Sequence, residues 1–370
     1  MTSAADIAQT DLDRLTGELA PELGRMAGKQ LLITGGAGFL GYYLVQAAVH
    51  WNLAKPVADR IRVTVWDNGV RGLPEWLVAL AGAPGYRFEP VDLIRPLPAL
   101  AEPLDFVIHA AGIASPMVYR RLPLETIDAN LNGLRSLLEQ ARRQADAGHP
   151  VQGFLFFSSS EIYGDPPADQ IPTAETFRGY VSCTGPRACY DESKRMGETL
   201  CVVFARHYGV PTRMARPFNN YGPGLRIHDG RVIPDFARAL LAGQDLVMHS
   251  DGSPTRTFCY SADAVSGYYR VLVRGRPGEA YNIGVETPEI SMRELGELLC
   301  ELGRELFGYR GTLVLRPSPE AEYLVDNPQR RCPVITKART EVGYAPQVAL
   351  PEGLRRALIW YAGNREPEGA

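Results

Sequence analysis

A tyrosine and a lysine four residues apart are the pair in this sequence best suited to chemistry. Tyr190 and Lys194 lie in the run GPRACYDESK at residues 185–194. In a helix, residues i and i+4 share one face, so the ammonium group would lie beside the phenol. A nearby positive charge favours the phenolate and lowers the pKa of a tyrosine from its reference of about 10. We therefore expect Tyr190 to act as a base that takes a proton from a hydroxyl group.

The same spacing also occurs between ordinary surface residues, so the pair needs support from other motifs. One such motif is SSSEIYG at residues 158–164, in which Ser160 ends a predicted strand over residues 153–160 and Glu161 follows it. Together the two runs supply a base, its lysine, a hydroxyl group and a carboxylate. This combination favours an active site over two isolated surface residues.

A glycine-rich turn near the N-terminus predicts a site for a dinucleotide. The run QLLITGGAGFLG at residues 30–41 passes from a short apolar strand into glycines and then into an apolar helix. Gly35 would permit the tight turn, Gly38 would let the backbone approach a pyrophosphate, and Gly41 would let the helix pack on the strand. Two further predicted contacts of this turn are Phe39 and Leu40.

Acidic residues close to the ends of the next two predicted strands suit the adenosine part of a dinucleotide. Asp67 stands near the end of the strand at residues 62–68, where an acid binds the ribose hydroxyl groups. No arginine follows it directly, which favours NAD over NADP, although Arg71 lies four residues further on. Asp92 could reach the adenine edge. The other predicted cofactor contacts are Asn68, Leu93, Ala110, Ala111, Gly112, Asn130, Ser158 and Pro217.

Strands alternate with helices through the first half of the chain, which predicts an α/β fold with a doubly wound parallel sheet of the Rossmann type. We expect the NAD-binding domain over residues 29–215, with returning segments near 255–285. Residues 1–28 are expected to form an N-terminal arm, either a short amphipathic helix or a frayed segment, and residues 361–370 a tail.

The composition is that of an ordinary globular protein of 370 residues, 45% hydrophobic and 22% charged. A net charge of −3 offers no footprint for a polyanion, so we expect no nucleic-acid partner. No apolar run approaches the roughly 18 residues of a membrane span, and the N-terminus lacks the apolar core of a secretion signal. The cysteines lie far apart without a CxxC pair, which argues against a metal site and favours a cytoplasmic protein with reduced thiols.

Several motifs occur in the order seen in one family. TGGAGFLG, HAAG, SSSEIYG, Tyr-x-x-x-Lys and RPFNNYGP make the chain resemble the extended short-chain dehydrogenase/reductases that act on nucleotide sugars. The match runs from about residue 29 to about residue 360. Within this group the chain most resembles the UDP-glucuronate decarboxylases, also called UDP-xylose synthases. That resemblance rests on YGDP (163–166), GPRACYDESKRMGETL (185–200), DGRVIPDF (229–236), PTRTFCYSADAV (254–265) and DNPQRRCPVITKA (326–338).

The resemblance implies a UDP-sugar substrate, a tightly bound and recycled NAD, and a homodimer packed through helices. It also implies a smaller C-terminal α/β domain, largely residues 216–360, that would bind the substrate. In such enzymes the tyrosine takes the proton of the sugar 4-hydroxyl while C4 gives up a hydride. A 4,6-dehydratase carries Asp-Glu after the fifth strand and uses the aspartic acid to protonate the leaving 6-hydroxyl. This chain has Ser160–Glu161 there, and a serine cannot replace that acid, so dehydration is disfavoured.

UDP-glucuronate needs no such acid, because its C4 ketone is a β-keto acid that loses CO2 directly. Return of the hydride gives UDP-xylose, while part of this clan releases the 4-keto-pentose instead. By resemblance, Glu161 and Arg256 flank the departing carboxylate and Ser160 hydrogen-bonds near C4. Arginine suits the diphosphate because its planar fork matches phosphate oxygens. The other implied substrate contacts are Tyr119, Asn219, Arg231 and Arg331.

Other functions remain as alternatives at this point. A nucleotide-sugar 4,6-dehydratase or 4-epimerase would share the first step, and a non-enzymatic sugar-nucleotide binder would share the fold. The intact pair of Tyr190 and Lys194 argues against a binder, which has no use for a phenolate. The chain also departs from the usual decarboxylase pattern, with Ser182–Cys183 for Asn-Pro, Gly224 for arginine, His249 for tyrosine and Glu125 for lysine.

Overall fold

Seven parallel strands in the order β11-β6-β5-β4-β1-β2-β3 form the central sheet of this computed structural model, which describes residues 2–317 and 327–364. The chain runs outward from β1 in both directions, which confirms the predicted doubly wound sheet. The strands of this sheet are β1 (Gln30–Thr34), β2 (Arg62–Asp67), β3 (Tyr86–Pro90), β4 (Phe106–His109), β5 (Gly153–Phe157), β6 (Thr212–Pro217) and β11 (Ala280–Ile283).

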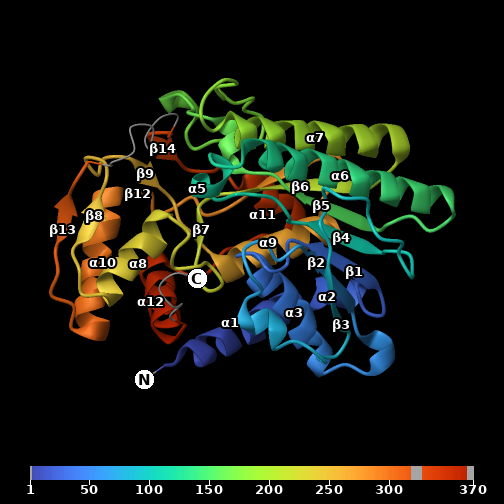
Figure 1. The fold of residues 1–370 in the computed structure, drawn as a ribbon, viewed down its shortest axis with the longest axis horizontal. Helices are drawn as coiled ribbons and strands as arrows, with labels where there is room; N and C mark the ends of the chain where they lie inside the picture. The colour runs from blue at the N-terminus through green and yellow to red at the C-terminus, as the bar shows by residue number, and fades with distance from the viewer. Residues whose placement is uncertain (1, 318–326, 365–370) are drawn as a thin grey trace.

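Helices cover both faces of this sheet, because successive buried side chains point to opposite faces. In β1, Leu31 and Ile33 join one hydrophobic cluster and Leu32 joins the other. α3 and α9 lie over the first face, and α6 and α7 lie side by side over the second, along the upper edge in Figure 1. The helices of this part are α3 (Gly41–Leu53), α4 (Glu75–Val78), α5 (Pro116–Tyr119), α6 (Pro123–Asp146), α7 (Ala188–Tyr208), α9 (Ser261–Arg274) and α11 (Thr336–Val342).

A smaller α/β part lies at the left in Figure 1. In the described residues its short strands form three small sheets, and the helix α10 begins at a capping box of Ser291 and Glu294. Its elements are β7 (Asn220–Tyr221), α8 (Val232–Leu241), β8 (Leu246–Met248), β9 (Thr255–Arg256), β10 (Cys259–Tyr260), β12 (Ile290–Ser291), α10 (Met292–Phe307), β13 (Leu313–Leu315), β14 (Arg330–Arg331) and α12 (Leu350–Gly363).

Single-turn 3-10 helices occur in the loops, and η2 follows β5 directly, where it carries the SSSEIYG motif. The chain returns from the smaller part to the large sheet through α9 and β11, within the expected segment near residues 255–285. None of the helices in the described ranges combines the length and the apolar character that a bilayer span requires. The 3-10 helices are η1 (Val57–Asp59), η2 (Ser160–Tyr163) and η3 (Ala168–Gln170).

The two ends of the chain are more ordered than expected. Residues 1–28, expected as an arm, contain α1 (Ala4–Glu18) and α2 (Ala20–Arg25), and α1 packs against α3, α9 and α12. The tail was expected to begin at residue 361. This boundary is wrong, because α12 continues to Gly363 with Tyr361 fully buried. Residues 365–370 of that tail lie outside the described residues.

Asp11 ties α1 to the core, and its removal should destabilise the protein. The buried carboxylate accepts hydrogen bonds from the phenols of Tyr43 and Tyr260, each at 2.5 Å, and pairs with Arg356 at 2.7 Å. Asp11→Ala would leave these donors without their acceptor, so we expect a loss of about 3 kcal/mol in the free energy of unfolding.

Urea unfolding followed by circular dichroism measures this loss. Asp13→Ala is the control, because Asp13 lies on the same helix with its side chain 60% exposed and pairs only with His50 in the described residues. A further hydrogen bond comes from the Gln9 amide. This variant should lose much less stability than Asp11→Ala, because an exposed ion pair contributes little. Equal losses in the two variants would show that the buried network contributes no more than a surface ion pair.

Candidate active site

A cavity of about 1910 Å³ lies where the carboxyl edge of the large sheet faces the smaller part. Its walls include the turn after β1, the ends of β2, β4 and β5, the start of α7, and residues of α8, β9 and β14. All the residues predicted for cofactor or substrate line it, with the exception of Asn130. Ligands of open α/β sheets bind at this edge, so the predicted site residues meet in the expected place.

The glycine turn after β1 leaves no room for side chains. A Cβ on Gly35, which has a φ of +73°, would lie 2.5 Å from the Ala111 backbone. A Cβ on Gly41 would lie 2.1 Å from the carbonyl oxygen of Gly36. Strand, turn and helix therefore approach closely, and the amino terminus of α3 follows at once. This backbone cradle fits the pyrophosphate of a dinucleotide.

Asp67 stands at the adenosine end of the predicted cofactor site. Its carboxylate accepts hydrogen bonds from the backbone N–H groups of Ala37 at 3.0 Å and Gly69 at 2.9 Å. Arg71, because of which NADP remained an alternative cofactor in the sequence analysis, pairs instead with Asp229 of the smaller part at 3.3 Å. A carboxylate at this position, with the nearby arginine engaged elsewhere, disfavours the extra phosphate of NADP.

Tyr190 and Lys194 are both buried on α7. Lys194 Nζ donates to the Phe157 carbonyl oxygen at 2.9 Å and lies 5.7 Å from the centre of the Tyr190 ring. Burial raises the pKa of Tyr190 to about 12 and lowers the pKa of Lys194 to about 7. The expected fall in the pKa of Tyr190 is therefore wrong for this structure. The loss of hydration raises the pKa of Tyr190 by more than Ser159 and the charge of Arg231, which both favour the phenolate, lower it.

Ser159 is a site residue that the sequence reasoning missed. Its hydroxyl group interacts with the phenol of Tyr190 and favours the phenolate. Its oxygen also accepts from the Glu161 N–H at 3.2 Å, as the cap of η2. The neighbouring Ser158 instead donates to Glu198 at 2.5 Å. Three serines follow one another here, and only the path of the chain after β5 shows which hydroxyl meets the tyrosine.

Glu161 is a carboxylate held by two arginines. Arg331 donates to both of its oxygens at 2.6 Å, and Arg187 donates to one of them. Burial opposes ionisation, but the charges of Arg187, Arg331 and Arg256 outweigh it and lower the pKa of Glu161 to about 2. Glu161 is thus ionised at neutral pH. Arg187 lies within the GPRACYDESK run, yet nothing in its spacing marked it as a site residue.

Arg256 interacts electrostatically with Glu161 but, within the described residues, forms no ion pair with it. Its guanidinium donates to the carbonyl oxygens of Thr255 at 2.7 Å, Pro328 at 2.5 Å and Gln329 at 3.1 Å. Burial, together with the positive charge of Arg331, lowers the pKa of Arg256 to about 9. Because its anchors are mostly neutral carbonyls, its charge remains available to an anion in the cavity.

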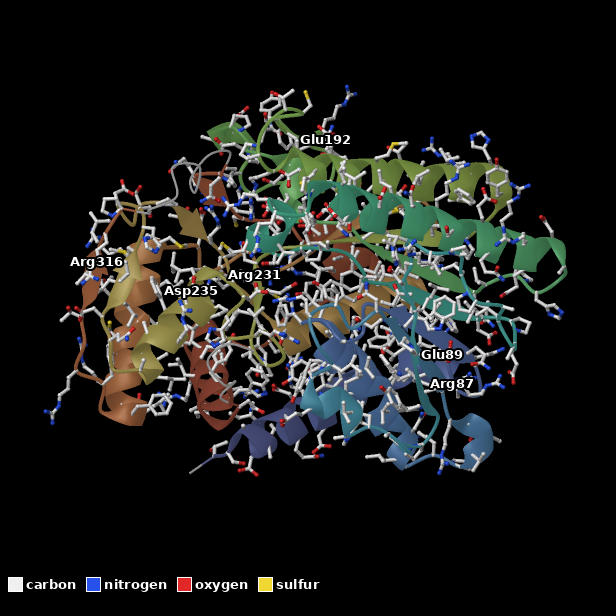
Figure 2. All side chains as sticks on the ribbon, in the orientation of Figure 1. Arg87, Glu89, Glu192, Arg231, Asp235 and Arg316 are labelled. Atoms are coloured by element: carbon white, nitrogen blue, oxygen red, sulfur yellow. The ribbon has the colours of Figure 1, made fainter. Side chains whose placement is uncertain are left out.

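The remaining predicted substrate residues share the cavity. Tyr119 stacks on Tyr190 with ring centres 5.1 Å apart. Asn219, with a φ of +39°, donates from its side-chain amide to a backbone carbonyl of the smaller part at 2.9 Å. Arg231 precedes α8 at the junction of the two parts, as Figure 2 shows, and pairs with Asp229 at 3.2 Å. The cavity therefore has a basic side toward the smaller part.

Asn130 is the predicted cofactor residue that stands behind the wall. Its side-chain amide donates from α6 to Ser193 Oγ at 2.9 Å. Its oxygen lies 2.3 Å from where a Cβ on Gly112 would be. Asn130 thus packs behind the tip of β4, and a direct contact with the cofactor stays a prediction.

Comparison with known proteins identifies the family of this chain. Residues 31–284 match the NAD dependent epimerase/dehydratase family. The chain belongs to this family. It is 37% identical over 328 residues to UDP-glucuronic acid decarboxylase 3 of Arabidopsis thaliana, a match that covers 88% of this chain and 86% of the relative. The resemblance to these decarboxylases and to the extended short-chain dehydrogenase/reductases is thereby confirmed.

Solved members of the epimerase/dehydratase group have the same fold. Epimerase Mth375 of Methanothermobacter thermautotrophicus superposes with a TM-score of 0.75 at 29% identity, over 92% of this chain and 94% of that one. The dTDP-glucose 4,6-dehydratase DesIV of Streptomyces venezuelae, with NAD and TYD bound, has a TM-score of 0.74 at 28% identity, over 91% and 98%. The cofactor of this family is NAD, and the glycine turn and Asp67 fit it.

Gly224 is a place where this family member departs from the arginine typical of the decarboxylases. With a φ of +90°, its Cβ would lie 2.3 Å from the Cβ of Tyr42. A side chain cannot fit at this position, so a basic group for the diphosphate must come from elsewhere. Arg231 lines the same cavity and can supply it, whereas Arg331 is held by Glu161.

Asp67 should set the preference of this family member for NAD. We expect Asp67→Asn to narrow the affinity gap between NAD and NADP by about tenfold, because it removes a negative charge that would face the 2′-phosphate. Equilibrium binding measured by quenching of protein fluorescence gives both affinities. Asp59→Asn, an exposed change in η1, should leave the ratio unchanged. A ratio that stays at its wild-type value in Asp67→Asn would show that this carboxylate does not select the cofactor.

Proposed function

We propose that this protein decarboxylates UDP-glucuronate, through a 4-keto intermediate, to UDP-xylose, with the 4-keto-pentose as the product when release precedes reduction. The observation that carries the proposal is the cluster of Arg187, Arg256 and Arg331 around the single carboxylate of Glu161. Its net positive charge faces the cavity beside Tyr190 and suits a sugar that carries a carboxylate. The identity to UDP-glucuronic acid decarboxylases supports the same substrate.

In this proposal each side chain has one task. Tyr190, whose phenolate the nearby Ser159 favours, removes the proton of the 4-hydroxyl. Bound NAD supplies the hydride acceptor for C4, and its positive ring favours the phenolate. The resulting ketone makes the C6 carboxylate that of a β-keto acid. CO2 then leaves without an added acid, and the electrons stay on C5 as an enolate.

The arginines and Glu161 act on the departing carboxylate in opposite senses. Arg256 attracts it into place, since its charge is not taken up by an ion pair in the described residues. Glu161, ionised beside it, raises the energy of the bound carboxylate relative to neutral CO2. The 4-ketone stabilises the enolate that remains, and C5 then receives a proton.

A nucleotide-sugar 4,6-dehydratase or 4-epimerase is the second candidate, because solved proteins with this fold include a UDP-glucose 4-epimerase and a dTDP-glucose 4,6-dehydratase. Ser160 argues against dehydration, since a hydroxyl group does not protonate a leaving 6-hydroxyl at neutral pH. A 4-epimerase of neutral sugars is disfavoured because such a sugar carries no negative charge for the arginine cluster to bind. A 4-epimerase of an acidic sugar shares this charge match, and the product of the reaction distinguishes it.

Incubation of the purified protein with UDP-glucuronate, with CO2 capture and mass detection of the nucleotide, tests the proposal. A mass loss of one CO2 means UDP-xylose, and a loss of CO2 and two hydrogens means the 4-keto-pentose. UDP-glucose serves as the neutral control. Unchanged mass with UDP-glucuronate, together with epimerisation of either sugar or loss of water from UDP-glucose, would replace the decarboxylase with the second candidate.

We also propose a homodimer packed through α6 and α7. These helices lie side by side along one edge (Figure 1) and expose apolar side chains. Light scattering should give twice the chain mass, and Val203→Glu should reduce it to one chain. A wild-type monomer would refute the dimer. The exposed apolar residues are Leu124, Met196, Val203 and Tyr208.

We further propose that the protein works in the cytoplasm. All six cysteines of the sequence are unpaired, and four of them are buried. Unpaired thiols are typical of a reducing compartment. Fluorescence microscopy of a tagged full-length chain tests this location.

A further inference from the structure

A buried carboxyl group that the proposed reaction does not use lies behind the arginine cluster. Asp191 follows Tyr190 on α7 and is 5% exposed. Its Oδ2 lies 3.7 Å from Arg187 Nε, which is too long for a hydrogen bond. Within the described ranges its Oδ1 has no hydrogen-bond partner. Buried carboxylates are normally paired or hydrogen-bonded, so this weak support calls for a functional reason.

Charges of both signs face Asp191. Burial and the negative charge of Glu161 disfavour its ionised form, and they prevail over Arg187 and Arg331, so the pKa of Asp191 rises to about 7. Arg187 offers little more attraction because Glu161 already binds it. Glu161 itself stays ionised. The other ionisable groups that interact with Asp191 are Tyr119, Cys189 and Tyr190.

Asp191 can influence a ligand only through its neighbours. Glu161, Arg187 and Arg331 form the wall of the cavity, whereas Asp191 stands behind this wall. Little water lies between these side chains to screen its charge, because Asp191 and the three wall residues are largely buried. A change in the charge of Asp191 therefore changes the electrostatic potential at the place where the wall meets a substrate.

We propose that Asp191 is a positioning residue that takes up a proton when an acidic sugar binds, and so lets a second carboxylate lie beside Glu161. This inference rests on the proposed function. With Asp191 neutral, Arg187, Arg256 and Arg331 serve Glu161 and the sugar carboxylate. With Asp191 ionised, a third negative charge competes for the same guanidinium groups, and the acidic sugar binds more weakly. The affinity for a neutral sugar does not depend on the charge of Asp191.

Proton uptake on binding gives a direct test. Calorimetric titrations of the full-length protein with NAD at pH 7.5, in two buffers of different ionisation enthalpy, count the protons taken up. Tyr190→Phe is the background, so that the sugar does not react. If binding raises the pKa of Asp191 by about one unit, UDP-glucuronate should cause uptake of about 0.5 proton. UDP-xylose lacks the carboxylate and should cause no uptake.

Asp191→Asn keeps the shape of the side chain and cannot titrate, so it should abolish the difference between the two ligands. Lys194, whose pKa also lies near 7, is present in both proteins and with both ligands, so its contribution to the proton uptake cancels in the comparison. Asp191→Glu should restore the difference. If Asp191→Asn does not unfold cooperatively on heating, it is not a valid comparison. The protein with Asp191 intact then provides the test, since equal proton uptake with UDP-glucuronate and UDP-xylose would overturn the inference.

Steady-state kinetics give a second readout. The KM of the wild-type enzyme for UDP-glucuronate should rise by up to about tenfold between pH 6.5 and 9, whereas that of Asp191→Asn should stay flat. Glu192→Gln is the matched control, because Glu192 is the next residue on α7 and is exposed, as Figure 2 shows. It should keep the wild-type profile.

The outcomes separate the two proposals. Normal turnover of UDP-glucuronate with unchanged proton uptake and pH profile in Asp191→Asn would refute the role of Asp191 alone. No turnover by the wild-type protein would refute the proposed function. In that case the ligand-dependent uptake would still report whether Asp191 responds to a bound carboxylate.

Discussion

Tyr190→Phe should lower the turnover of UDP-glucuronate by about 1000-fold or more, the upper range for loss of a general base. The phenol is the group that faces the cavity next to Ser159, and phenylalanine cannot accept the proton of the 4-hydroxyl. The ring itself remains, so its stacking on Tyr119 and the packing of α7 should survive. The loss should therefore fall on kcat, with little change in stability.

Single-turnover absorbance of the reduced nicotinamide isolates this step, because it reports hydride transfer from C4 before CO2 is lost. Tyr208→Phe is the matched control, since Tyr208 ends the same helix and is 44% exposed. It should leave the rate within about twofold of wild type, as expected for a surface change. A Tyr190→Phe enzyme that retained a tenth of the wild-type rate would remove Tyr190 from the role of base.

Glu161→Gln should slow turnover by about 100-fold while NAD binding stays unchanged. The carboxylate is ionised at neutral pH, and its charge is what opposes the bound carboxylate of the sugar. Glutamine keeps the size of the side chain but removes that charge. Arg187 and Arg331 are then free to hold the sugar carboxylate more firmly. We therefore expect KM to fall together with kcat, the mark of lost ground-state strain.

Steady-state release of CO2 gives kcat and KM, and fluorescence titration gives the affinity for NAD. Glu192→Gln, on the exposed side of α7, again provides the control and should match wild type. Unchanged kcat in Glu161→Gln would exclude Glu161 from the reaction. A rise in KM at constant kcat would mean that Glu161 merely orders the arginines that bind the sugar.

The large sheet could be predicted because its signals are local. Each strand is a short apolar run, and the glycines at 35 and 41 mark a turn whose tightness the backbone itself imposes. The position of Asp67 was predictable for the same reason, since it is the last residue of β2. The N-terminal helices had only a weak amphipathic pattern, and their order depends on the distant partners of Asp11.

The arginine cluster shows what local reasoning cannot reach. Glu161 and Arg331 are far apart in the chain, and their ion pair exists only because β14 lies beside β9 next to η2. The direction of the Tyr190 pKa was mispredicted for a related reason. The spacing to Lys194 can be read from the sequence, but the degree of burial cannot, and burial contributes most to the pKa of both groups.

Taken alone, the amino-acid sequence determined the fold class, the nucleotide cradle and most of the residues that line the cavity, because turns, strand periodicity and i, i+4 spacing act over a few residues. Tertiary structure alone decided which serine meets Tyr190, which arginines bind Glu161, and that Asp191 is buried among them. Charge and hydration depend on what the folded chain brings within a few ångströms, and that information is not local.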